Sequence, residues 1–196
     1  MALWTDALIF QDYDNPALPF LQEMKASCFY VPACLSLGLY KPAATLMRSF
    51  VENALYFSYF KDHQSELVTL TRNPSFFLDR TSIMTYHELH TPGFKDKQSA
   101  LNLNALLKDW YAMISAIIHG RVPGLWSAPS LVETAFDEKK NAAAIKEFEA
   151  AVQIINFIFL ATTPHEIWEG IRPDTRSHFL KGLKGSQKGI IVSYPE

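Results

Sequence analysis

Apolar residues recur at steps of three and four along much of the chain, which is the spacing of one face of an α-helix. The clearest stripe in the first half consists of Ala43, Met47, Phe50, Ala54 and Phe57. Pro42, just before this stripe, suits a first helical turn, because an N–H is not needed there. The pattern predicts a helix that begins near Pro42 and ends around residues 61–62.

The second half predicts three further helices. The strongest runs from about Ala100 to Gly120, where glycine suits the C-terminal cap. Its broad apolar face consists of Leu103, Leu106, Leu107, Trp110, Ile114, Ile117 and Ile118. After a loop over residues 122–129, helices are predicted over about 136–163 and 164–183, and residues 189–194 are expected to form a short strand.

Periodicity is weaker in the rest of the chain. Residues 1–19 are expected to be irregular because they contain the turn formers Asp12, Asp14, Asn15 and Pro16. A helix is predicted from residues 16–19 to about Leu37, with a kink at Pro32. A short helix is predicted over residues 75–85 and a loop over residues 87–99.

Alternation of apolar and polar residues, the pattern of a half-buried strand, is otherwise scarce. The sequence therefore predicts an all-α fold, an antiparallel bundle of four to five main helices. Its length fits one domain over residues 1–196. Within that domain we expect a core bundle over about 20–165 and a basic C-terminal helix and tail over about 166–196.

Composition narrows the classes of function. Hydrophobic residues make up 48% and charged residues 19% of the chain, which supplies a core and excludes a disordered protein. The net charge is −2, so any contact with nucleic acid needs a local basic patch. Cys28 and Cys34 are too few for a disulfide framework and are expected to be free thiols. No signal peptide and no apolar run of membrane length is recognisable, so we expect a cytoplasmic protein with no membrane partner.

Arg48 and Glu52 lie one helical turn apart, and Tyr56 and Tyr59 continue the same face. An arginine before a glutamate supports a helix less than the reverse order, so helix support alone explains the pair poorly. One interpretation is an ordinary ion pair. The other is a functional pair, in which Arg48 offers a cationic fork and Glu52 orients it or a neighbouring histidine.

A later helix carries a narrow polar stripe on an otherwise apolar surface. Tyr111, Ser115 and His119 follow one another at four-residue steps, and Arg121 comes just after the helix. His119 either caps the helix carbonyls or acts as a general base or phosphate contact, since imidazole titrates near neutral pH.

Other polar clusters are weaker candidates. His87 and His90 are three residues apart and lack an evident third ligand, so a metal-dependent hydrolase is the least favoured hypothesis, and no metal or cofactor is predicted. Asp62 and His63 form either a local ion pair or a helix end. The most basic segment carries Arg172, Arg176, His178, Lys181, Lys184 and Lys188. It is either a solvated helix face or a contact for an RNA backbone or an acidic partner.

Two of these helices together resemble the HEPN superfamily (higher eukaryotes and prokaryotes nucleotide-binding domains). The similar prokaryotic branch has an Arg-Ser-x-x-Glu-Asn helix followed by aromatic residues, and a later helix that ends in Ser-x-x-x-His-Gly. The matching positions are Arg48, Ser49, Glu52, Asn53, Ser115, His119 and Gly120. The resemblance spans roughly residues 20–165.

The resemblance implies an up-and-down bundle of four or five helices and, usually, a homodimer whose facing sites form one cleft. Many members are metal-independent ribonucleases, often toxins of toxin–antitoxin pairs or antiphage effectors. Active members resemble one another in an arginine that is separated from the histidine by four to six residues and holds the scissile phosphate. The histidine acts on the ribose 2′-hydroxyl or the leaving oxygen.

This sequence departs from that pattern, because the corresponding positions hold Ala112, Met113 and Ile114. Either Arg48 or Arg121 supplies the positive charge, or the domain does not cut RNA. We therefore predict a HEPN-like ribonuclease or an RNA- or nucleotide-binding effector of prokaryotic defence or stress response. Its candidate site residues are His119, Arg48, Glu52, Ser115 and Arg121. The alternative is a catalytically inactive helical module that dimerises or holds a partner protein.

Overall fold

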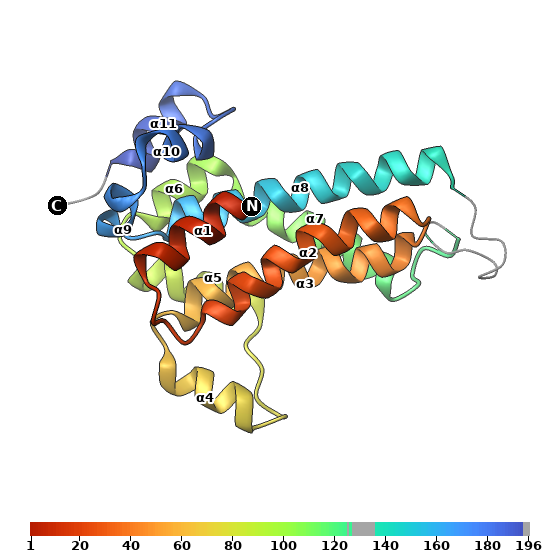
Figure 1. The fold of residues 1–196 in the computed structure, drawn as a ribbon, viewed down its shortest axis with the longest axis horizontal. Coiled ribbons are helices and arrows are strands. Elements are labelled where there is room, and N and C mark those ends of the chain that lie inside the picture. The colour runs from red at the N-terminus through yellow and green to blue at the C-terminus, as the bar shows by residue number, and fades with distance from the viewer. Residues whose placement is uncertain (125, 127–135, 194–196) are drawn as a thin grey trace.

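The computed structural model describes residues 1–124, 126 and 136–193, and this part of the chain contains 11 helices and no strand (Figure 1). The first five helices are α1 (Ala2–Gln11), α2 (Leu18–Ser36), α3 (Tyr40–Phe60), α4 (Gln64–Arg72) and α5 (Arg80–His90). The others are α6 (Phe94–Leu101), α7 (Leu103–Ile118), α8 (Glu138–Thr162), α9 (His165–Gly170), α10 (Pro173–Phe179) and α11 (Gly185–Val192). The prediction of an all-α helical bundle is confirmed.

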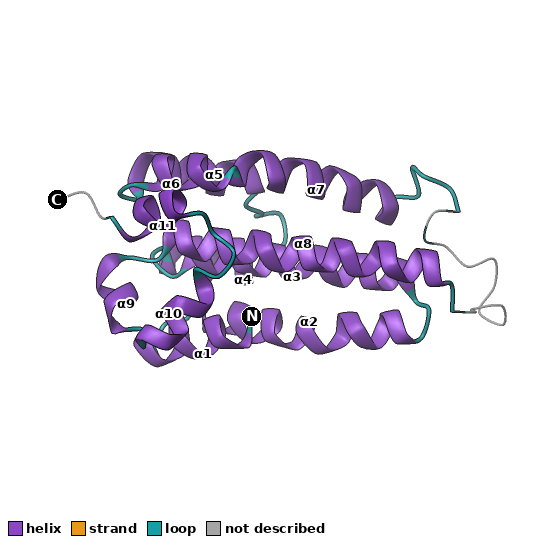
Figure 2. Ribbon diagram, turned by 90° about the horizontal axis from the view of Figure 1, so that it is seen from above, coloured by secondary structure: helices purple, strands orange, loops and turns teal. Residues whose placement is uncertain are grey.

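The four long helices α2, α3, α7 and α8 lie side by side and form the bundle (Figure 2). Helix α3 is its central member and packs against the other three. Twelve of its 21 residues are buried, including Phe50, Ala54 and Phe57 of the predicted stripe. Burial extends beyond one stripe because neighbouring helices cover α3 from several sides. The polar residues that α3 keeps near the surface are therefore few, and Arg48 and Glu52 are among them.

The two ends of the chain meet over α8. Trp4 of α1 stacks on Phe179 of α10, with the ring centroids 3.7 Å apart and the planes at 4°. The Trp4 Nε1–H donates a hydrogen bond to Asn156 Oδ1 of α8 at 2.7 Å. One hydrophobic core cluster consequently includes residues from Trp4 to Ile191. None of the helices in the described ranges combines the length and apolarity needed to cross a bilayer.

Two of the local predictions fail near the N-terminus and in the middle of the chain. Residues 2–11 are not irregular but form α1, which buries Trp4 and Leu8 against the bundle, whereas residues 12–17 form the expected turns. The expected loop over residues 87–99 is mostly helical, since α5 continues to His90 and α6 begins at Phe94. The loop was predicted because the segment is polar, and polar residues are usually exposed. His87 and other polar residues of this segment are buried instead.

The C-terminal prediction was also wrong in detail. The expected helix over residues 164–183 is divided into α9 and α10 by extended backbone at Ile171 and Arg172. The expected strand at residues 189–194 is instead helix α11 as far as Val192, and it buries Ile191. By contrast, the helices over 42–61, 100–120 and 136–163 are present as α3, α7 and α8. Half of the predicted loop over 122–129, residues 125 and 127–129, lies outside the described residues, and the described half belongs to no helix.

Candidate functional site

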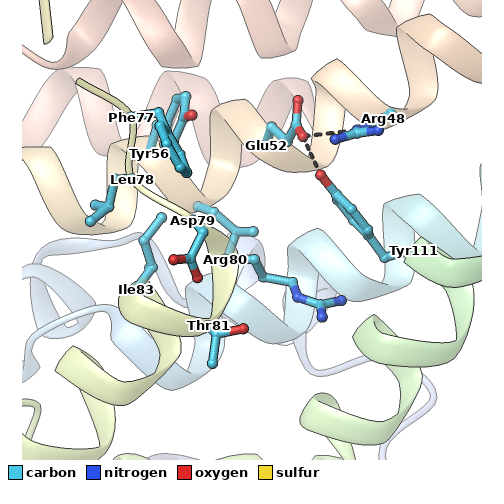
Figure 3. A pocket seen from close by; sticks show the side chains of 11 residues that line it. Arg48, Glu52, Tyr56, Phe77, Leu78, Asp79, Arg80, Thr81, Ile83 and Tyr111 are labelled. Carbon is cyan, nitrogen blue, oxygen red and sulfur yellow. Dashed lines mark hydrogen bonds and ion pairs between the residues drawn. The ribbon is translucent and has the colours of Figure 1, made fainter. Parts of the chain in front are cut away.

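A cavity of about 340 Å³ lies among α3, α5, α7 and the segment 73–79 that leads into α5 (Figure 3). This cavity, the Arg48–Arg80 pocket, is lined by Arg48, Glu52, Leu55, Tyr56, Phe77, Leu78, Asp79, Arg80, Thr81, Ile83 and Tyr111. Figure 3 shows Arg48 and Tyr111 toward one end and Tyr56 and Phe77 toward the other. The pocket therefore has a cationic end and an aromatic end.

Glu52 joins the two helices that form the cationic end. Its Oε1 accepts a hydrogen bond from Arg48 Nε at 2.9 Å and a second from the Tyr111 hydroxyl. The guanidinium carbon of Arg48 lies 4.7 Å from the centroid of the Tyr111 ring, which is close enough for a cation–π contact. Arg48, Glu52 and Tyr111 consequently hold one another in fixed positions.

Arg80 brings a second guanidinium to the same ring. Its guanidinium carbon lies 4.9 Å from the Tyr111 centroid, and its Nη1 donates to the carbonyl oxygen of Leu107 at 3.3 Å. Within the described ranges no carboxylate forms an ion pair with Arg80. The neighbouring Asp79 is engaged elsewhere, because its Oδ1 accepts from the backbone N–H of Ser82 at 3.0 Å and caps α5.

The four charged side chains that line the pocket, Arg48, Arg80, Glu52 and Asp79, carry no net formal charge, but they are not paired evenly. Arg48 is neutralised by Glu52, whereas Arg80 keeps a positive charge without an ion-pair partner among the described residues. Burial, followed by the hydrogen bond to the Glu52 carboxylate, raises the pKa of Tyr111 to about 12. Tyr111 is therefore a neutral phenol at physiological pH. The two guanidinium groups beside a neutral phenol can bind an anion.

The aromatic end combines a fixed ring with an exposed one. The Tyr56 ring is held by Phe20, at a centroid distance of 5.4 Å, and by Phe60, at 5.7 Å. Phe77 is 74% exposed although it lines the pocket. A large apolar ring that faces water at the mouth of a cavity favours an aromatic or apolar ligand group.

The structure brings together some of the predicted site residues and not others. Arg48 and Glu52 form the predicted pair and line the pocket, whereas Ser115, His119 and Arg121 do not line it. His119 is exposed and follows the last residue of α7. It comes eight residues after Tyr111, which is about 12 Å along a helix axis. Within one chain the predicted site residues therefore lie in two places, with Arg48 and Glu52 at the pocket and the other three outside it.

His87 has a structural role that its sequence neighbourhood did not indicate. Its Nε2 lies 3.0 Å from the Ser58 hydroxyl, and its Nδ1 lies 2.8 Å from the Thr91 hydroxyl. The Ser58 hydroxyl donates to the carbonyl of Leu55 at 2.7 Å, so it accepts from His87 Nε2. In the described part of the chain, no three His, Cys, Asp or Glu side chains are grouped as metal ligands would be.

The other sequence candidates are engaged in local contacts. In the basic C-terminal segment, Arg172 pairs with Asp174 at 3.0 Å and Arg176 with Glu169 at 2.6 Å, so part of its charge is neutralised. His63 stacks on Tyr59 with the ring centroids 4.0 Å apart. These contacts are typical of local stabilisation, whereas the Arg48–Arg80 pocket places two arginines at one cavity.

Arg80 and Phe77 were not among the residues predicted from the sequence. One signal was available for Arg80, because Asp79 is a favoured N-cap residue and would have placed Arg80 in the first turn of α5. No sequence signal placed α5 beside Tyr111, since that contact joins segments about 30 residues apart.

The fold and the pocket together define an all-α bundle with a cationic and aromatic cavity on one side. Comparison with protein-family models, with curated proteins and with solved structures found no match.

Proposed function

We propose that the protein is a HEPN-like RNA-binding protein that holds a backbone phosphate of RNA in the Arg48–Arg80 pocket. The observation that carries this proposal is the second guanidinium, because Arg80 lies against Tyr111 without an ion-pair partner among the described residues. Guanidinium groups bind phosphate oxygens in two parallel hydrogen bonds. A role in defence or stress response stays a prediction from the resemblance.

The two arginines can contact one ligand. Each guanidinium carbon lies within 4.9 Å of the Tyr111 centroid, so the two are no further apart than the sum of those distances. Figure 3 shows the Tyr111 ring between the two guanidinium groups, so a ligand that contacts both must pass the edge of this ring. Glu52 accepts a hydrogen bond from Arg48 Nε and so fixes the guanidinium group. The two Nη groups of Arg48 can then bind phosphate.

Replacing Arg80 by alanine should weaken binding of single-stranded RNA by about tenfold, because a hydrogen bond to a charged group contributes about 1.5–3 kcal/mol. Fluorescence anisotropy with a labelled oligoribonucleotide measures the affinity. Arg72→Ala is the matched control. Arg72 is exposed at the end of α4, so this substitution removes the same charge outside the pocket. Equal losses for the two variants would contradict the proposal.

Cleavage is a separate activity that phosphate binding does not require. A general base must lie within hydrogen-bond reach of the proton it removes, and His119 follows the C-terminal end of α7, eight residues after Tyr111 of the pocket. We expect the purified protein to leave bound RNA intact in EDTA, as judged by gel electrophoresis. If the wild type cuts RNA without a metal and His119→Ala does not, this result would support the nuclease hypothesis. A second copy of the chain would then have to complete the site.

A further inference from the structure

Phosphate binding explains the cationic end of the Arg48–Arg80 pocket but not its exposed aromatic ring. We infer that Phe77 and Tyr56 form a subsite that stacks an unpaired nucleobase, while the phosphate of the same nucleotide unit lies against Arg80 and Arg48. The inference rests on the proposed function and specifies its ligand as single-stranded RNA or a free nucleotide rather than a duplex.

The backbone on both sides of Phe77 is held by hydrogen bonds. Asn73 accepts hydrogen bonds from the backbone N–H groups of Ser75 and Phe76, both at 3.0 Å, and Asp79 caps α5 at the other end of the segment. Phe76 and Leu78 are half-buried against the core, so the intervening Phe77 points outward.

Tyr56 provides the second wall of the subsite. Its contacts with Phe20 and Phe60 prevent the ring from turning away. Among the described residues, none forms a hydrogen bond with its hydroxyl, and burial raises its pKa, so the hydroxyl stays protonated. It can therefore donate to, or accept from, the edge of a base that lies against Phe77.

The dimensions and chemistry of the pocket favour an unpaired base. A cavity of about 340 Å³ is at the lower end of the range for small-ligand sites, which suits one nucleotide unit. In a duplex both faces of each base are covered by its neighbours, whereas a single strand can present a face to an aromatic side chain. Leu55, Leu78 and Ile83 supply further apolar contact at the same pocket.

The test compares a short single-stranded oligoadenylate with an abasic oligonucleotide of the same length by fluorescence anisotropy. Phe77→Ala should weaken oligoadenylate binding by about five- to hundredfold and leave binding of the abasic strand unchanged. Phe77→Trp, which keeps an aromatic face, should retain the wild-type affinity for oligoadenylate. Phe10→Ala is the matched control, because Phe10 is 80% exposed and lies outside the pocket.

The outcomes separate this inference from the proposed function. Arg80→Ala should weaken both strands, since it removes a phosphate contact. If Phe77→Ala weakens both strands equally or neither strand, the base subsite is overturned while phosphate binding stands. If the wild type binds neither strand, or if Arg80→Ala changes neither affinity, both proposals fail. Because Phe77 is exposed, its removal should leave the free energy of unfolding nearly unchanged, which urea denaturation checks.

Discussion

Acidification below pH 6.5 should lower the free energy of unfolding by about 1.4 kcal/mol for each pH unit through His87 alone. His87 is 2% exposed, and burial, reinforced by the positive charge of Lys61, lowers its pKa from 6.5 to about 3. Between these two values the unfolded chain binds a proton that the folded protein does not bind. Stability from the neutral imidazole is therefore complete above pH 6.5 and is lost as the pH falls toward 3.

The hydrogen bonds of His87 explain why protonation is unfavourable. The neutral ring donates from Nε2 to Ser58 on α3 and accepts at Nδ1 from Thr91, which uses both nitrogens without a charge. The network fastens the C-terminal part of α5 to α3. Because Arg80 begins the same helix, loosening of α5 at low pH should also displace one arginine of the pocket.

Urea denaturation at a series of pH values measures the effect. His87→Gln, which cannot titrate, should unfold with a shallower pH dependence than the wild type between about pH 6.5 and about pH 4.5. His90→Gln is the control, since His90 is exposed on the same helix and should leave the wild-type slope in place. Parallel pH profiles for wild type and His87→Gln would show that His87 is not the titrating group.

Trp4→Ala should lower the free energy of unfolding by about 3–5 kcal/mol, the usual loss for a fully buried aromatic residue. Trp4 is 1% exposed, stacks on Phe179 of α10 and donates to Asn156 Oδ1 of α8, so its removal takes away contacts of α1 with both helices. Trp4→Phe keeps a ring against Phe179 but loses the N–H donor, and it should show a smaller loss of about 1–2 kcal/mol.

Chemical denaturation gives the total change, and amide hydrogen exchange locates it. In Trp4→Ala the amides of α1 and α10 should exchange faster, while those of α3 in the centre of the bundle should stay protected. Phe10→Ala serves as the control on the same helix, because Phe10 is 80% exposed. A loss for Trp4→Ala no larger than that for Phe10→Ala would contradict the packing described for the two chain ends.

The candidate site shows which contacts between residues can be predicted from local sequence. Arg48 and Glu52 are four residues apart on one helix, so their pairing followed from helical periodicity and is present at 2.9 Å. Tyr111 and Glu52 are 59 residues apart, and their hydrogen bond depends on how α7 packs on α3. The motif around His119 predicted that it lies at the same site as Arg48 and Glu52. In the structure His119 follows the end of α7 and is exposed. The catalytic role predicted for His119, Ser115 and Arg121 stays a prediction.

The sequence alone determined that the protein is all-α, because the apolar stripes of α3, α7 and α8 repeat with the period of a helix. It did not determine which polar residues are buried, since His87 and Lys97 become interior only when other helices cover them. Tertiary structure also decided the site. Packing of α5 and α7 against α3 placed Arg80 beside Tyr111 and left His119 outside the pocket, and no pattern within one helix encodes a contact between helices.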